Sequence, residues 1–199
     1  IYPERLVYPW LKQVEALNRP SRYEEYEKIS NRVGIKGCLH MEVDVREDQI
    51  EEETRLIDDL MPLSSRLIKG AISACRPEND DFPLFLERVQ NNPKIKGLRR
   101  VLHVRPDELS QDSIFRDNVK RLSGTGLTFD VCVSQRQLSI ATDLVDHCPG
   151  VTFILDHCGV PNIKLGDFDD WRSKILEISK RKNVFCKVSG LIAYGDCES

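Results

Sequence analysis

The 199-residue sequence predicts an α/β protein built on a parallel sheet, and two observations support this prediction. Six short apolar runs rich in β-branched residues begin 24 to 33 residues apart, which is the length of one strand–helix unit. The segments between them carry amphipathic helical patterns, or turn residues such as Gly124-Thr-Gly126 and Pro149-Gly150. Strands that alternate with helices in this way form parallel sheets.

The order of the elements follows from these patterns. The predicted strands are residues 37–43, 67–74, 95–103, 127–133, 151–156 and 184–189. The predicted helices are residues 23–33, 47–60, 81–90, 113–122, 135–147 and 168–180. Asp81 is expected to cap the third helix, because Pro83 suits the first helical turn. His147 is expected at a helix C-terminus, where a histidine favours the helix dipole and needs no chemical role.

Two architectures satisfy a parallel sheet of this kind, the open doubly wound sheet and the (β/α)8 barrel. Neither a GxGxxG fingerprint nor a Walker-type phosphate loop follows any of the predicted strands. This weakens the nucleotide-binding form of the open sheet. A barrel requires eight strands, and the sequence shows six, with only a Tyr8-Pro-Trp10 turn and one helix before the first of them.

Composition and cysteine usage exclude several classes of protein. Lys and Arg number 29 against 32 Asp and Glu, which argues against a protein that binds nucleic acid by neutralising phosphates. No apolar run approaches the roughly 20 residues of a membrane span. The seven cysteines contain no CxxC pair, which predicts free thiols in a reducing, cytoplasmic setting. The cysteines in or beside apolar runs are expected to be small buried hydrophobes rather than a zinc cluster: Cys38, Cys132, Cys158 and Cys186.

The strongest candidate for chemistry is His157, because function in parallel α/β folds collects where strands end. It follows the apolar run that ends at Leu155 and precedes Gly159. A neutral imidazole at this position can bind a metal ion or polarise a carbonyl. A histidine that only makes hydrogen bonds at the end of the sheet is the alternative.

Charged residues within the strands give further candidates. Alternation places Arg99 and His103 on one face of their strand and Arg100 on the other. An inward Arg99 would suit a carboxylate or a lactone oxygen, whereas an outward one would pair with an acid on a flanking helix. Glu42 shares a face with His40, toward either the interior or the helices. Lys187 is expected either paired in a polar core or near the mouth of the fold.

Six segments together resemble one family, the amidohydrolase-related lactonases, which includes fuconolactonase-like and rhamnonolactonase-like enzymes and pyrone-dicarboxylate lactonase. They occur in the order and spacing of that family across almost the whole chain. They are Tyr8-Pro-Trp-Leu11, Gly37 with its strand, Lys96-Gly-Leu-Arg-Arg100, Gly126–Asp130 with Gln137-Leu138, Leu155-Asp-His-Cys-Gly159 with Pro161, and Cys186-Lys-Val-Ser-Gly-Leu191.

The resemblance implies a (β/α)8 TIM barrel that hydrolyses a cyclic ester. By this resemblance His157 is the catalytic histidine after strand six, and it contacts the substrate carbonyl or one divalent metal ion such as zinc. Arg99 would be a substrate clamp on strand four. His103, which stands where sugar-lactone relatives often have Gln, would also contact substrate, as would Glu42 and Trp10.

The same resemblance implies that this single domain, residues 1–199, is incomplete at both ends. It would hold strands two to seven of the barrel. The first strand, with its His-x-His motif, and the last strand, with its general-base Asp, are expected outside the sequence. The expected partner is a small lactone or carboxylate.

Two alternatives to a lactonase stay open. One is a barrel remnant that binds a ligand or partner, with a homo-oligomer completing the sheet. The other is an amidohydrolase-fold decarboxylase, because a fold does not determine a reaction.

Overall fold

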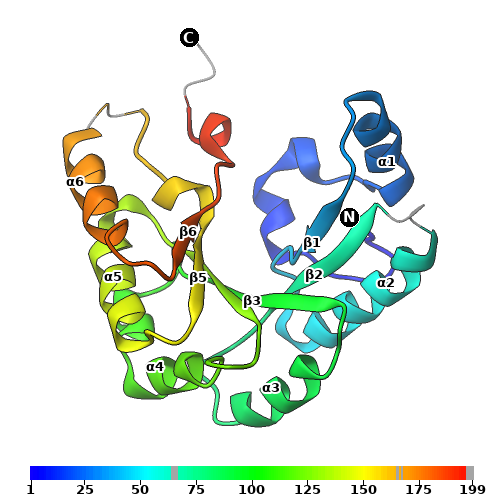
Figure 1. The fold of residues 1–199 in the computed structure, drawn as a ribbon. Helices are drawn as coiled ribbons and strands as arrows, with labels where there is room; N and C mark the ends of the chain where they lie inside the picture. The colour runs from blue at the N-terminus through cyan, green and yellow to red at the C-terminus, as the bar shows by residue number, and fades with distance from the viewer. Residues whose placement is uncertain (64–66, 165, 167, 196–199) are drawn as a thin grey trace. The chain divides into compact units, whose positions relative to one another are not determined.

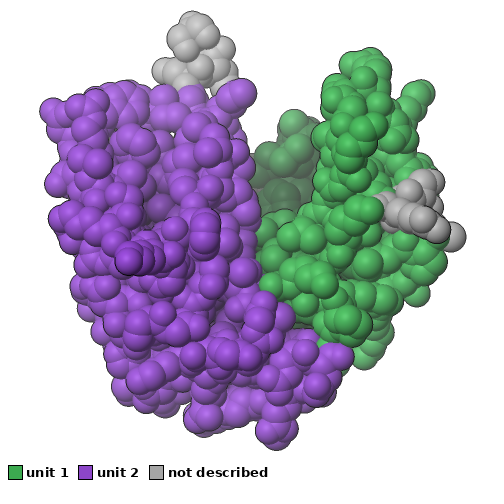
Figure 2. Space-filling view, in the orientation of Figure 1, with its two compact units in different colours: residues 1–74, 92–96 green, residues 75–91, 97–199 purple. Residues whose placement is uncertain are grey.

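The computed structural model describes residues 1–63, 67–164, 166 and 168–195 (Figure 1). The chain divides into two compact units, which Figure 2 shows in different colours. Unit 1 comprises residues 1–74 and 92–96, and unit 2 comprises residues 75–91 and 97–199.

The predicted α/β class is confirmed. The strands are β1 Cys38–Met41, β2 Ile68–Ala74, β3 Ile95–Val101, β4 Thr128–Cys132, β5 Thr152–Leu155 and β6 Val184–Cys186, and they follow one another in the sheet in chain order. The α-helices are α1 Tyr23–Arg32, α2 Ile50–Leu63, α3 Phe82–Gln90, α4 Ser113–Lys120, α5 Leu138–His147 and α6 Phe168–Ile178. Every predicted strand and helix is present, and most differ from the prediction only by a few terminal residues. His147 ends α5 as expected.

Unit 1 is organised around the parallel pair β1–β2 and the helix that joins them. Helix α2 directs Leu56 and Ile57 into the core, where each is at most 4% exposed. Polar contacts hold the same helix to the sheet, because Thr54 Oγ1 lies 3.3 Å from Ser73 Oγ. Lys94, just before β3, donates to Asp58 on α2 at 2.7 Å. These polar contacts and the apolar side chains of α2 thus hold the helix against one face of the sheet.

In unit 2 the strands β3, β4, β5 and β6 pair in parallel, and helices α4 to α6 lie along one side of them (Figure 1). Side-chain alternation sorts the two faces. Phe129 and Phe153 are fully buried and meet edge-to-face with ring centroids 5.9 Å apart, while Phe115 of α4 packs on Phe129 at 6.3 Å. This apolar layer is the core of the unit, and it leaves Arg99 and Asp130, which are partners in register, on the opposite face.

The cysteine prediction needs correction. All four cysteines are free thiols, but only Cys132 is buried. Cys38 and Cys158 are half-buried, and Cys186 is exposed on β6, where the described residues provide no further strand to cover it. The helices that the structure describes include none long and apolar enough to cross a bilayer.

Candidate functional site

Four charged side chains meet on the face of the unit 2 sheet that lies opposite the phenylalanine core. Lys187 Nζ donates to Asp130 Oδ2 and to Asp156 Oδ1, each at 2.6 Å. Arg99 Nη1 donates to Asp156 Oδ2 at 3.3 Å. Each side chain comes from a different strand or from the residue directly after it, because β3, β4, β5 and β6 bring their carboxyl ends together.

Burying these charged side chains costs free energy unless their charges balance. Asp130 and Asp156 are 1% and 0% exposed, and Arg99 is 8% exposed. Burial raises the pKa of Asp130, although the Lys187 ammonium opposes the rise. Burial also lowers the pKa of Lys187, but its two carboxylate partners together outweigh that effect and leave the pKa above its usual value. Lys187 therefore stays an ammonium ion, and two cations face two carboxylates in a nearly neutral cluster.

His157 sits on a strained turn directly after Asp156. His157, Cys158, Gly159 and Val160 all have positive φ angles, from 46° to 69°. Three of them are not glycine, and each such residue costs on the order of 1–3 kcal/mol unless its surroundings impose the conformation. Two contacts impose it here. The Cys158 amide donates to Lys187 O at 3.2 Å, and Trp171 Nε1 donates to Cys158 O at 2.8 Å.

The residues after β6 hold the ring of His157. Ser189 Oγ lies 2.9 Å from His157 Nδ1. Gly190 follows in the left-handed region, at φ +68°, and a Cβ atom there would lie 2.7 Å from the same Nδ1. Only glycine therefore leaves room for the imidazole at this place. Because Nδ1 is engaged by Ser189, Nε2 is the nitrogen that remains for a substrate or a metal ion.

Cys132, Asp156 and His157 form the group in the described residues that could hold a metal ion. Their donor atoms all lie within 4.8 Å of one another. Thiolate, carboxylate and imidazole are the donors that zinc takes in proteins. Cys132 Sγ also lies 3.4 Å from His103 Nδ1, which joins His103 to this group.

A pocket of about 580 Å³ adjoins His103 in unit 2. The turns after β4 and β5 and the first turns of α6 form its walls. It is lined by His103, Ser134, Gln135, Arg136, Val160, Pro161, Asn162, Lys164, Asp170, Lys174 and Ala193. This volume is in the range of small-molecule sites.

Unit 1 holds the other two predicted site residues. Trp10 Nε1 donates to Val43 O at 2.8 Å, which places Trp10 beside the end of β1. Glu42 is 2% exposed, and its Oε2 accepts the backbone N–H of Asp44 at 2.7 Å. His40 faces α2, since its Nε2 lies 2.9 Å from Glu53 Oε1. The substrate contacts predicted for Trp10 and Glu42 stay predictions.

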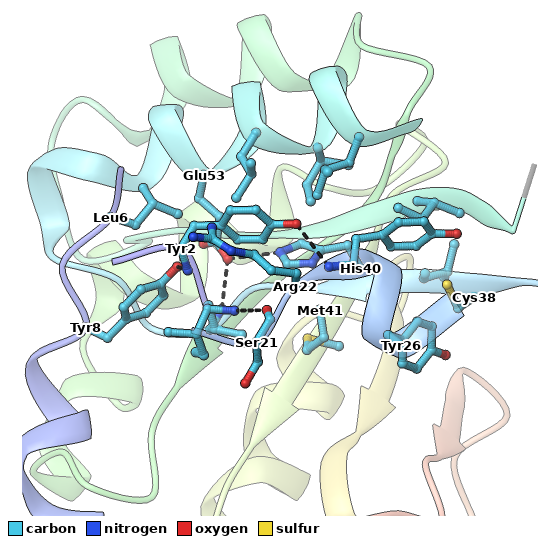
Figure 3. Close-up of a pocket in the computed structure, with 18 residues that line it drawn as sticks. Tyr2, Leu6, Tyr8, Ser21, Arg22, Tyr26, Cys38, His40, Met41 and Glu53 are labelled. Atoms are coloured by element: carbon cyan, nitrogen blue, oxygen red, sulfur yellow. Dashed lines mark hydrogen bonds and ion pairs between the residues drawn. The ribbon is translucent and has the colours of Figure 1, made fainter. Parts of the chain in front are cut away.

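Unit 1 also contains a pocket of about 450 Å³, shown in Figure 3. Its walls are largely apolar, and Tyr2, Tyr8 and Tyr26 line it together with the hydrogen-bonded pair of His40 and Glu53. Arg22, which stacks over the Tyr2 ring at 4.6 Å, binds Glu4 as well. The candidate metal donors found among the described residues lie around His157 and not in this pocket, so this pocket offers less for catalysis.

The structure thus brings together three predicted residues, Arg99, His103 and His157, in unit 2. Lys187 adopts the paired arrangement that was one of its two alternatives, with its side chain 33% exposed. Arg100 faces the opposite way and pairs with Glu78. Sequence reasoning missed Asp130, Asp156 and Cys132 as site residues. Asp130 was detectable, because a lone carboxylate inside an apolar strand requires a buried cation as partner.

The chain is similar in sequence to a curated enzyme. The chain is 24% identical over 179 residues to the L-fucono-1,5-lactonase of Burkholderia ambifaria. The alignment covers 89% of this chain and 60% of that enzyme. The chain therefore spans less than two thirds of the length of that curated relative.

Solved structures show the same fold. An amidohydrolase from Burkholderia multivorans superposes with a TM-score of 0.82 at 21% identity, covering 95% of this chain and 67% of that one. A second structure of an amidohydrolase from this organism, with bound zinc, gives a TM-score of 0.80 at 23% identity over 95% and 66% of the chains. The 5-carboxyvanillate decarboxylase of Sphingomonas paucimobilis gives 0.58 at 16% identity over 94% and 70%.

The decisive match is to a family rather than to a single relative. A sequence model described as amidohydrolase matches residues 33–198, from the end of α1 through β6 and the residues that follow it. That range contains Arg99, His103, Asp130, Asp156, His157 and Lys187. Because the match covers most of the chain, this protein belongs to the amidohydrolase family.

Proposed function

We propose that this protein is a hydrolase that opens a lactone ring by adding water to its acyl carbon. The observation that supports this most directly is the orientation of the His157 imidazole. Its Nδ1 is engaged by Ser189, and the strained turn leaves Nε2 for a carbonyl oxygen. In the reaction a bond forms between water oxygen and the acyl carbon, the ring C–O bond breaks, and the water proton passes to the released alkoxide. A donor aimed at the oxygen that gains charge accelerates such a step.

Arg99 is proposed to contact the substrate beside His157. Its pairing with buried Asp156 fixes the guanidinium near the carboxyl ends of β3 and β5. Asp156 in turn is held by Lys187. The network therefore supports the residues that touch the substrate, and its ion pair with Asp156 holds the Arg99 guanidinium in place.

One divalent ion is compatible with this site. Cys132, Asp156 and His157 supply three donors of the kinds that zinc accepts, and zinc is bound in a solved structure of the same fold. Asp156 accepts from Lys187 and Arg99, but each carboxylate oxygen has a second lone pair. When bound, such an ion would take the Nε2 lone pair of His157 and would polarise the substrate carbonyl as a Lewis acid, so that His157 would hold the ion instead of donating to the carbonyl.

We further propose a (β/α)8 barrel in which the described strands are the second to the seventh. Its first strand, with the His-x-His motif, and its last strand, with the general-base Asp, would lie outside these 199 residues. Two observations support this. The curated relative from B. ambifaria is longer, since the chain spans 60% of it. In addition, Phe185 in β6 is 59% exposed, which is unusual for a parallel strand, and Val188 and Ile192, which follow β6, are 80% and 96% exposed.

The proposal is tested by an assay of the purified protein in its natural length. An uncharged aldono-1,5-lactone and 2-pyrone-4,6-dicarboxylate are supplied as substrates. Ring opening is measured as the release of protons, with and without a chelator. We expect ring opening of at least one lactone. Failure on both lactones would contradict the proposal, and CO2 release from 5-carboxyvanillate would favour the decarboxylase alternative. Loss of activity with chelator, restored by zinc, would establish the metal.

Ser189→Ala is expected to lower kcat about tenfold with little change in KM. The substitution removes the hydrogen bond to His157 Nδ1, which is worth about 0.5–1.5 kcal/mol. Without it, the proton of the imidazole is no longer fixed on one of the two ring nitrogens. The measurement is the pH profile of kcat, which should shift along with the rate. Ser179→Ala, on the exposed end of α6, is the matched control and should leave both unchanged. An unaltered pH profile in Ser189→Ala would show that Ser189 does not control the imidazole of His157.

A further inference from the structure

Cys158 and Cys186 are held against the same piece of backbone, where the turn after β5 meets β6. Leu155 of β5 and Cys186 of β6 are partners in register, so this turn begins beside Cys186. The Cys158 backbone N–H donates to Lys187 O at 3.2 Å, and the Cys158 thiol lies 3.7 Å from the same oxygen. The backbone that carries Cys186 therefore also positions Cys158.

The side chains of the two cysteines also contact each other. Partial burial of its sulfur and a hydrogen bond with the Cys158 thiol raise the pKa of the Cys186 thiol to about 11. The Cys158 backbone N–H faces the Cys186 sulfur as well. Cysteines whose side chains already face each other meet the main geometric requirement for a disulfide. The pair can therefore be joined without separating β5 from β6.

Cys186 gives a small oxidant access to this pair. Of the six cysteines that the structure describes, only Cys186 is exposed. Cys158 is half-buried, whereas Cys75, Cys132 and Cys148 are buried. A small disulfide can therefore reach the Cys186 sulfur first and leave Cys158 to complete the reaction from the inner side.

We propose that Cys158 and Cys186 form a reversible disulfide by exchange with a small disulfide such as oxidised glutathione, and that this bond displaces the imidazole of His157. The Cys186 thiolate attacks one sulfur of the small disulfide, whose S–S bond breaks and releases a first small thiol. Cys158 then attacks the Cys186 sulfur and releases a second small thiol. The two protein thiols lose two electrons and two protons, which leave with the two small thiols.

The new bond would act on His157 through the backbone of the strained turn. His157 and Cys158 both lie in the left-handed region, at φ 53° and 55°. The Cys158 N–H is bonded to Lys187 O, and the Cys158 carbonyl accepts Trp171 Nε1 at 2.8 Å. With Cys158 held on both sides, a bond at its sulfur must be accommodated by the peptide that joins it to His157. Rotation of that peptide moves the His157 ring away from Ser189, whose Oγ now lies 2.9 Å from Nδ1.

Peptide mapping of the protein in its natural length tests the disulfide and needs no turnover. The protein is incubated with an excess of oxidised glutathione, alkylated and digested. We expect a peptide pair that is linked through Cys158 and Cys186 and disappears on reduction with dithiothreitol. The link should form over hours, because a thiol with a pKa of about 11 is mostly protonated near neutral pH. Free thiols at both positions, a stable adduct with glutathione, or a bond to a different cysteine would each overturn the inference.

NMR of the histidine side chains tests the displacement without an assay of activity. Oxidation is expected to shift the imidazole signals of His157. Those of His147, which ends α5 and contacts Asp117 instead, should stay unchanged as the internal control. Unchanged His157 signals in the linked protein would overturn the inference.

The expected effect on turnover rests on the proposed lactonase function. The kcat for lactone opening should fall at least fivefold when the disulfide forms, and it should recover on reduction. A linked protein that keeps the parent kcat would overturn the control of His157 by this bond. If no lactone is opened in either state, the proposed function fails, whereas the linked peptide and the His157 signals still decide the inference.

Two variants locate the sensitive thiols. Cys186→Ser is expected to abolish the link and to keep the kcat of the reduced parent within twofold, with circular dichroism to verify folding. Its kcat and His157 signals should no longer respond to oxidised glutathione. Cys38→Ser changes a half-buried cysteine of unit 1, and as the matched control it should still form the link. A response of Cys186→Ser equal to that of the parent would place the sensitive thiol elsewhere and overturn the inference.

Discussion

Lys187→Met is expected to lower the free energy of unfolding by about 3 kcal/mol at pH 7.5, the lower end of the range for breaking a buried ion pair. The ammonium of Lys187 lies 2.6 Å from both Asp130 and Asp156, which are 1% and 0% exposed. Its removal leaves one of these carboxylates, Asp130, without its cation. The lower end of the range applies because the Lys187 side chain is 33% exposed, so that water can partly replace it. Urea denaturation measures the change.

The deficit should shrink as the pH falls. Burial already places the pKa of Asp130 above its unfolded value, and loss of the Lys187 ammonium raises it further. A carboxyl with a raised pKa in the folded state binds a proton on folding, so its protonated form stabilises the fold below that pKa and the benefit is lost as the pH rises through it. The difference between Lys187→Met and the parent protein should therefore be smaller at pH 5 than at pH 7.5.

Two further variants make this result specific to the network. Lys182→Met removes an exposed lysine just before β6 and should change stability by less than about 0.5 kcal/mol. Asp130→Asn combined with Lys187→Met should recover part of the loss, because the stranded acid is gone. A Lys187→Met protein as stable as the parent, or a deficit that grows toward pH 5, would show that Asp130 and Asp156 do not depend on this cation.

Gly190→Ala is expected to reduce kcat for lactone opening about 10²-fold, approaching the loss produced by His157→Asn. The added Cβ would lie 2.7 Å from His157 Nδ1, where the Ser189 hydrogen bond now is, so the ring must move. A displacement of about 1 Å of a catalytic group can cost that much. Steady-state kinetics at saturating lactone measures the effect, with circular dichroism to verify folding.

Two glycine controls separate displacement of the ring from backbone strain. Gly124→Ala places a Cβ at φ +78° with nothing within 4 Å, so it reproduces the strain far from His157. Gly195→Ala meets Ile192 O at 3.4 Å, an ordinary contact for a Cβ atom. Both should retain the parent rate. If Gly190→Ala also retained it, the imidazole of His157 would not require the position that Gly190 leaves open.

Element positions were predictable because they depend on local patterns. Each predicted strand is an apolar run bounded by turn residues, and parallel pairing needs no exact end point. Alternation alone also separates Arg99 from Arg100, and the structure places the two arginines with different acids, Asp156 and Glu78. These two facts require only a two-residue period, which the sequence shows directly.

The partners within the site could not be predicted in the same way. Lys187 meets Asp130 across one intervening strand, since β5 lies between β4 and β6. Which residues stand opposite depends on sheet register, and a single sequence does not specify register. The left-handed run from His157 to Val160 was also unforeseen, because two of its residues, Cys158 and Val160, rarely adopt this conformation. Contacts from Lys187 O and Trp171 impose it, and those lie far away in the sequence.

The same run has a consequence for how the protein can evolve or be engineered. Val160 is β-branched, and at φ +46° it is the kind of residue that stability-guided design would replace by glycine. That replacement would relax the backbone between His157 and the wall of the pocket. At this turn, a substitution that raises thermal stability would disturb the orientation of the imidazole. Stabilising changes are therefore safer on the exposed surface of α6 than between residues 157 and 160.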